Sequence, residues 1–163
     1  MKKRGFLMMT LAIVFVVTFV LTNVAGAKSY GPVVSKQLSE VRQATAKYHD
    51  IEAAFEDGYG PKDETKYHLV PNMGIHLTNN ELLGTSTNDP LAPEVLVYEP
   101  KKNGGYKLVA VEYMSLGEER PSLFGQEFDD GPFPGSFALH AWVWQANPDG
   151  MFSPLNPNVA NVE

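Results

Sequence analysis

The hydrophobic positions in the first third of the chain follow a helical period. Between Ser35 and Gly60, apolar side chains recur at steps of three and four residues, with charged residues between them. The stripe consists of Leu38, Val41, Ala44 or Thr45, Tyr48, Ile51, Phe55 and Tyr59. Ser35 is a suitable N-cap, and Gly58 or Gly60 is a suitable stop. The pattern predicts one long N-terminal amphipathic helix, with Glu52 at the surface beside the stripe.

After this helix the pattern changes to short alternating runs separated by turns. Residues 67–77 could hold two very short strands, and residues 94–100 and 106–114 read as a hairpin joined by an Asn-Gly turn. Residues 115–135 read as a long loop rich in Gly and Pro, and residues 136–145 as the last strong strand. We therefore predict an α+β fold: one long helix packed on a small, mostly antiparallel sheet with long Gly/Pro-rich loops.

Two of the predicted strands carry a titratable side chain inside an apolar run. On a strict alternation, Glu112 shares a face with Leu108, Ala110 and Met114, and His140 shares a face with Ala138, Trp142 and Trp144. Both strands are apolar on both faces, so both are expected to be central and covered. A buried carboxylate is costly unless it is paired, protonated or bound to a metal, and a buried imidazole needs partners for its two nitrogens.

His76 is a third residue of this kind, because it ends a short apolar run and precedes a polar loop. We hypothesise that His76, Glu112 and His140 converge. Two imidazoles and one carboxylate would then form a divalent metal site with open positions, suited to Fe(II), Zn(II), Mn(II) or Cu(II). Met73 or Met114 beside it would favour copper. If the site is catalytic, the metal would activate a water or oxygen species and the 115–135 loop would cover it.

Two alternatives remain open on the sequence alone. His140 and Glu112 could be a satisfied buried pair in a structural domain, since no local metal motif links the candidate ligands. The protein could also be a non-enzymatic binding module of the cell envelope for a small apolar or sugar ligand, with a deep apolar pocket away from these residues. Donor atoms more than about 6 Å apart would exclude the metal site. His49 and His68 are predicted to lie at the surface.

The N-terminus has the features of a secretory signal peptide at residues 1–27. A basic start is followed by the apolar run from Phe6 to Leu21, and Ala25-Gly26-Ala27 offers a cleavage site after Ala27. The alternative is an uncleaved anchor, because this run is nearly long enough to span a membrane. After the signal segment, residues 28–34 are predicted to be a tether and residues 35–163 a single globular domain. Any membrane contact would come from the signal segment alone.

Charge and cysteine content exclude several classes of function. Residues 1–27 contain three of the 13 basic residues and none of the 19 acidic ones, so the remaining 136 residues carry a net charge of −9. Such a surface argues against nucleic acid and anionic lipid as partners. The chain has no cysteine. This excludes disulfides, thiolate metal sites, iron–sulfur clusters and cysteine nucleophiles, and it leaves a small-molecule ligand possible.

Several segments of the chain match the sequence pattern of a known group of proteins. They read YHDIEAAFEDGY, NMGIH, DPLAPEVLVYEP, LVAVEY, LFGQEF and LHAWVWQANPDGMFSPLNP. From Tyr48 to Val159 the chain resembles a family of uncharacterised small exported proteins of bacteria and some fungi. In that family the residue after the histidine of the NMGIH segment is often aromatic, whereas this chain has Leu77. The resemblance implies a single exported domain and carries no activity.

Overall fold

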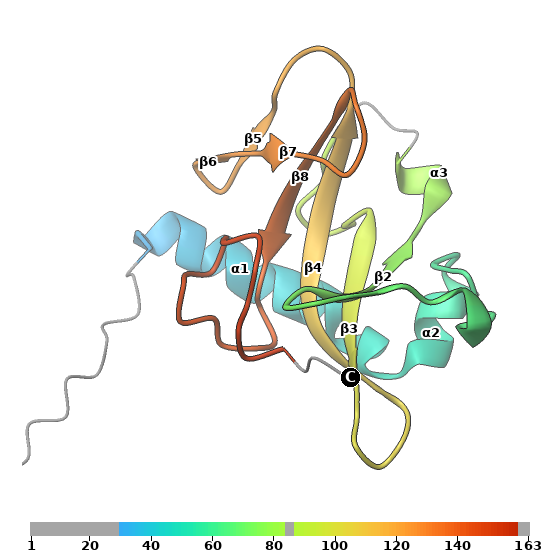
Figure 1. The fold of residues 1–163 in the computed structure, drawn as a ribbon. Helices are drawn as coiled ribbons and strands as arrows, with labels where there is room; N and C mark the ends of the chain where they lie inside the picture. Colours follow the sequence, from blue (N-terminus) through green and yellow to red (C-terminus); the bar gives the residue numbers. More distant parts are fainter. Residues whose placement is uncertain (1–29, 84–86, 160–163) are drawn as a thin grey trace, which may run out of the picture.

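The computed structural model describes residues 30–83 and 87–159, and it shows an α+β protein with an antiparallel sheet (Figure 1). The helices are α1 (Pro32–Thr45), η1 (Ala46–His49), α2 (Ile51–Glu56), η2 (Glu64–Lys66) and α3 (Asn80–Leu83). The strands are β1 (Leu69–Val70), β2 (Gly74–Thr78), β3 (Val95–Pro100), β4 (Tyr106–Leu116), β5 (Ser122–Leu123), β6 (Gln126–Glu127), β7 (Asp129–Asp130) and β8 (Ser136–Ala141). The predicted α+β class is confirmed. The predicted signal segment, residues 1–27, lies outside the described residues.

The helical segment is divided into pieces, so the prediction of one uninterrupted helix is wrong. Helix α1 begins at Pro32, within the predicted tether and ahead of the predicted N-cap Ser35, because proline suits the first turn of a helix. Asp50 adopts an extended conformation after η1, and its Oδ1 accepts a hydrogen bond from the Glu52 N–H at 3.1 Å. Asp50 therefore caps a new helix, α2. The predicted stripe still packs inward, at Leu38, Val41, Tyr48 and Phe55.

Six strands form the main sheet in the order β1-β2-β3-β4-β8-β7, and every neighbouring pair is antiparallel. Strands β4 and β8 are central, as predicted. The predicted 115–135 loop is in part structured: β4 continues to Leu116, β5 and β6 form a separate hairpin, and β7 pairs with β8. Strands β5, β6 and β7 have two residues each, too few to show an alternation of apolar and polar residues in the sequence. Phe124 and Gly125 turn the hairpin with positive φ, and phenylalanine is not a usual signal for such a turn.

A bulge in β4 changes which of its side chains face the helices. The register between β3 and β4 shifts by one residue, and the extra residue is Val109. Leu108 therefore packs with Val111 and Tyr113 in the core beneath the helices. Val109 instead lies in a separate cluster that includes Trp142. The prediction that Leu108 shares the face of the Glu112 side chain is wrong, because strict alternation holds only where the strand has no bulge.

Strand β8 ends at Ala141, earlier than predicted, because the Trp142 N–H donates to a carbonyl of the C-terminal loop. Trp142 does share the face of His140, and their rings stack with centroids 5.6 Å apart. Trp144 packs against the main core, and its Nε1–H donates to Thr45 Oγ1 in α1 at 3.2 Å. The prediction that Trp144 shares the face of His140 is therefore wrong, since alternation stops where the strand stops.

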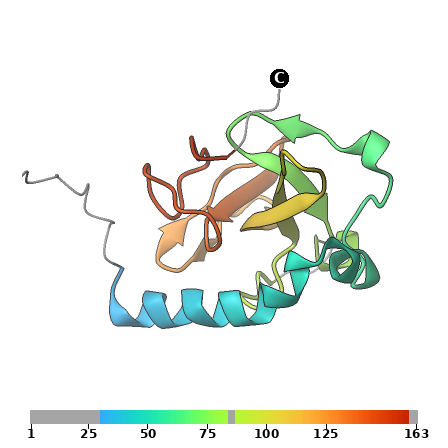
Figure 2. The same ribbon diagram turned by 90° about the horizontal axis from the view of Figure 1, so that it is seen from below.

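The main hydrophobic core lies between the helices and one face of the sheet, and α1 runs along that side in Figure 2. Hydrogen bonds tie the two layers together: Arg42 donates to the Val143 carbonyl at 2.8 Å, and Tyr98 Oη donates to the Tyr48 carbonyl at 2.7 Å. Two smaller apolar clusters cover parts of the other face. Within residues 30–83 and 87–159, none of the helices combines the length and apolarity that crossing a membrane requires.

Candidate metal centre

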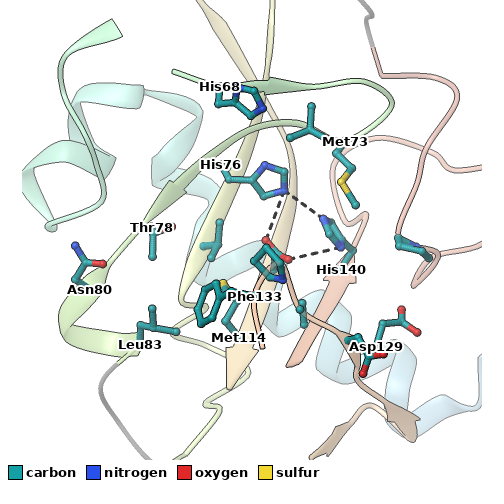
Figure 3. A pocket seen from close by; sticks show the side chains of 18 of the residues that line it. His68, Met73, His76, Thr78, Asn80, Leu83, Met114, Asp129, Phe133 and His140 are labelled. Atoms are coloured by element: carbon teal, nitrogen blue, oxygen red, sulfur yellow. Dashed lines mark hydrogen bonds and ion pairs between the residues drawn. The ribbon is translucent and has the colours of Figure 1, made fainter. Parts of the chain in front are cut away.

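The sheet brings His76, Glu112 and His140 together from three strands (Figure 3). Glu112 on β4 and His140 on β8 are directly paired across the antiparallel ladder. His76 lies on β2, separated from β4 by β3, where Val97 pairs with His76 and Val95 pairs with Glu112. The imidazole of His76 therefore reaches diagonally across β3 toward the pair. All three side chains point to the sheet face opposite the main core.

Gly74 positions His76. Its φ of +107° is unfavourable for any residue with a side chain, and a Cβ at this position would lie 2.5 Å from the Tyr98 carbonyl oxygen. Glycine thus lets β2 approach β3 closely. A backbone hydrogen bond at Gly74 also raises the pKa of His76, against the larger effect of burial. Such a bond orients the ring and leaves Nε2 directed at the other two residues.

The distances within the trio are short, and they lie at or beyond the long end of the hydrogen-bond range. The Nε2 atoms of His76 and His140 are 3.4 Å apart, and His76 Nε2 is 3.5 Å from Glu112 Oε2. His140 Nδ1 is 3.9 Å from Glu112 Oε1. One ligand atom from each residue can be chosen so that all three lie within 4.8 Å of one another. This is inside the limit of about 6 Å that a shared metal ion requires.

The three groups are electrically neutral at pH 7 in the absence of a metal. Burial lowers the pKa of His76 to about 4, and burial together with the neighbouring His76 lowers the pKa of His140 to about 3. Burial raises the pKa of Glu112 to about 8, and the nearby Glu94 carboxyl adds to this shift. Neutral imidazoles have the free lone pairs that metal binding needs. The His76 side chain is 22% exposed, so the site is accessible through this residue.

Glu94 is a buried carboxyl beside the site that the sequence pattern does not mark. Its Oε1 accepts a hydrogen bond from Asn88 Nδ2 at 3.0 Å, and its Oε2 accepts one from the Met114 N–H at 3.1 Å. Burial raises the pKa of Glu94. A glutamate directly before an apolar strand is usually exposed, so only the packing of β3 against β4 identifies this one.

A cavity of about 640 Å³ contains the trio. Its apolar walls include Val70, Met73, Leu83, Val95, Met114 and Ala138. Polar or charged side chains at its edge are exposed: Lys66 and His68 on one segment, Asp129 and Asp130 on β7. The sequence predicted that a binding module would have its apolar pocket away from the three candidate ligands. In the structure the apolar pocket and the candidate ligands are one site.

The remaining residues named in the sequence analysis lie as follows. His49 and His68 are both exposed, as predicted, and the His49 ring contacts Trp144 with a centroid distance of 4.3 Å. His68 lines the edge of the cavity without belonging to the trio. Met73 and Met114 both line the cavity, so both predicted thioethers are near the candidate ligands (Figure 3).

Comparisons with protein-family models, with curated proteins and with solved structures found no match for this chain. The resemblance to a family of small exported proteins stays a prediction. Functional conclusions therefore depend on the residues of the site itself.

Proposed function

We propose that the protein binds one divalent transition-metal ion between His76, Glu112 and His140. The imidazoles would serve as neutral ligands and Glu112 as the anionic ligand. This donor set suits Fe(II), Zn(II), Mn(II) or Cu(II). Three protein ligands leave at least one coordination position open, and that position would face the cavity.

The distances around His76 carry this proposal. Hydrogen bonds from nitrogen to oxygen are normally about 2.7–3.2 Å long. The two nitrogen-to-oxygen separations within the trio, 3.5 and 3.9 Å, are both longer, and the two imidazole nitrogens 3.4 Å apart make at most a weak hydrogen bond. Two ligands on one tetrahedral zinc ion, each bound at about 2.0–2.1 Å, lie about 3.3–3.4 Å apart. His76 Nε2 has this spacing to His140 Nε2 and nearly this spacing to Glu112 Oε2.

The alternative of a satisfied His–Glu pair fits these distances less well. A hydrogen-bonded pair, charged or neutral, would close to about 2.7–3.2 Å. A pair would also need only two residues, whereas the fold directs a third side chain, His76, to the same point. The position of the trio in the wall of an open cavity further favours a site that receives something from solution.

Elemental analysis tests the proposal directly. The full chain would be purified without chelator and assayed for Fe, Zn, Mn and Cu beside His76→Ala and His140→Ala. We expect close to one metal ion per chain in the parent and loss of metal in both variants. His68→Ala is the matched control, because His68 lines the same cavity outside the trio and its loss should leave the metal content unchanged.

A second measurement covers metal lost during purification. Each of the four metals would be added to the parent, and the melting temperature recorded. A metal that binds the folded state with a Kd 100-fold below its free concentration stabilises it by about 2.7 kcal/mol. An absence of metal in the parent, with no gain in melting temperature for any of the four, would reject the proposal. His140 and Glu112 would then be a buried polar pair.

A further inference from the structure

The open side of the proposed metal site faces an apolar chamber. Eight of the cavity-lining side chains are aliphatic or thioether groups: Val70, Met73, Leu83, Val95, Met114, Pro132, Ala138 and Pro154. Thr78 and Asn80 are the uncharged hydrogen-bonding side chains among the described lining residues. A sugar needs a partner for almost every hydroxyl, because unpaired polar groups are costly to bury. The walls therefore fit an apolar molecular body and not a sugar.

The charge of the site specifies the other end of such a molecule. A divalent ion with two neutral imidazoles and one carboxylate leaves one positive charge in a buried setting. Glu94 is not among the cavity-lining residues, and its two oxygens are engaged by Asn88 and Met114. A buried charge requires a partner of opposite sign. A single anionic oxygen group on the ligand would provide both this charge and a metal ligand.

The position of the charged side chains at the edge of the cavity also supports an apolar interior. Asp129 and Asp130 are exposed on β7, and Lys66 and His68 are exposed on the opposite segment. Apart from Glu112, the charged lining side chains thus lie at the exposed edge, and half-buried Thr78 is the other polar lining side chain, besides the trio, that is not fully exposed. The volume of about 640 Å³ matches the range of about 300–1,000 Å³ usual for small-molecule sites.

We infer that the cavity binds a small monocarboxylate with an aliphatic or aromatic body, its carboxylate on the metal and its body against the apolar walls. The inference rests on the proposed metal site. It goes further in naming the ligand class: one anionic oxygen head and an apolar tail. Phe133, which is 47% exposed at the cavity mouth, would cover part of the tail.

Octanoate and acetate are the probes that test this inference. The full chain would be loaded with Co(II), whose visible spectrum reports a change of ligands, and titrated with each acid. We expect octanoate to perturb the spectrum and to bind at least about tenfold more tightly than acetate, because burial of only two methylene groups gives that gain. Equal affinity for the two acids would overturn the apolar part of the inference.

Two controls test the position of the head. Octan-1-ol has the same tail without the charge, and we expect it to bind at least about tenfold more weakly than octanoate. We also expect octanoate to bind the metal-free protein more weakly than the Co(II) form. Equal binding of octanol, or equal binding of octanoate without metal, would overturn the placement of a carboxylate on the ion.

Phe133→Ala tests the position of the tail. We expect it to weaken octanoate binding several-fold and to leave acetate binding unchanged. Leu116→Ala is the matched control, because Leu116 is 50% exposed and does not line the cavity. Loss of octanoate binding in both variants, or in neither, would contradict the assignment. Metal uptake separates the two proposals: no uptake of cobalt or of any of the four metals rejects the metal site itself, whereas uptake without selective octanoate binding rejects only the ligand.

Discussion

Replacing Glu112 with Gln removes the charge of the proposed anionic ligand and keeps the shape of the side chain. The substitution should affect the stability of the metal-bound and the metal-free protein in opposite directions. With metal bound, the variant loses a charged ligand and most of the stabilisation that the ion provides. Without metal, the variant no longer has a buried carboxyl that must ionise at high pH, so its stability should become less dependent on pH.

The size of the second effect follows from the pKa of Glu112. Burial raises this pKa from 4.5 to about 8, so between these values the folded state binds a proton that the unfolded state has released. Stability therefore falls as the pH rises through this window, by about 1.4 kcal/mol per pH unit. Between pH 5.5 and pH 7.5 the parent should lose about 2–3 kcal/mol through Glu112 alone. Glu112→Gln should lose none of it.

His76 and His140 act in the opposite direction at lower pH. Their folded pKa values of about 4 and about 3 lie below the ordinary 6.5, so their contribution falls as the pH drops below 6.5. Both proteins contain these histidines, so the difference between parent and variant isolates Glu112. Urea unfolding in the presence of a chelator, at pH 5.5 and pH 7.5, measures that difference. Parallel pH dependence in the two proteins would refute the reasoning, because Glu112 would then be solvated or already ionised when folded.

Other substitutions test the parts of the fold that hold the site. Gly74→Ala places a Cβ 2.5 Å from the Tyr98 carbonyl oxygen at a φ of +107°, so we expect a loss of about 2–4 kcal/mol in urea unfolding and weaker metal binding. Gly104→Ala, with φ +88° and open space, should cost only about 1–2 kcal/mol and should not affect the metal. Tyr98→Phe removes the 2.7 Å hydrogen bond to the Tyr48 carbonyl and should cost about 1–2 kcal/mol, with metal content unchanged. Asp50→Ala removes the cap of α2 and should cost about 1 kcal/mol, and full metal loss in this variant would show that the site depends on the helical layer.

The sequence by itself determined the local character of the site. Apolar alternation in 106–114 and 136–141 marks central strands, and a carboxylate or an imidazole inside such a strand has to find a partner, whatever the fold. The Asn-Gly turn joins β3 to β4, and the antiparallel α+β class follows from the order of the patterns along the chain. These features depend on near neighbours, so the chain carries them in short segments.

The tertiary structure decided how those segments meet. The placement of β8 beside β4 pairs Glu112 with His140, and the approach of β2 to β3 at Gly74 brings His76 within reach, from positions distant in sequence. The bulge at Val109 and the end of β8 at Ala141 reassigned the faces of neighbouring side chains. The bulge and the end of β8 each depend on a hydrogen-bond partner from another segment of the chain. The hydrophobic periodicity of a segment does not show which other segment it will pair with. For the same reason, only the folded chain placed the apolar cavity and the candidate ligands in one site.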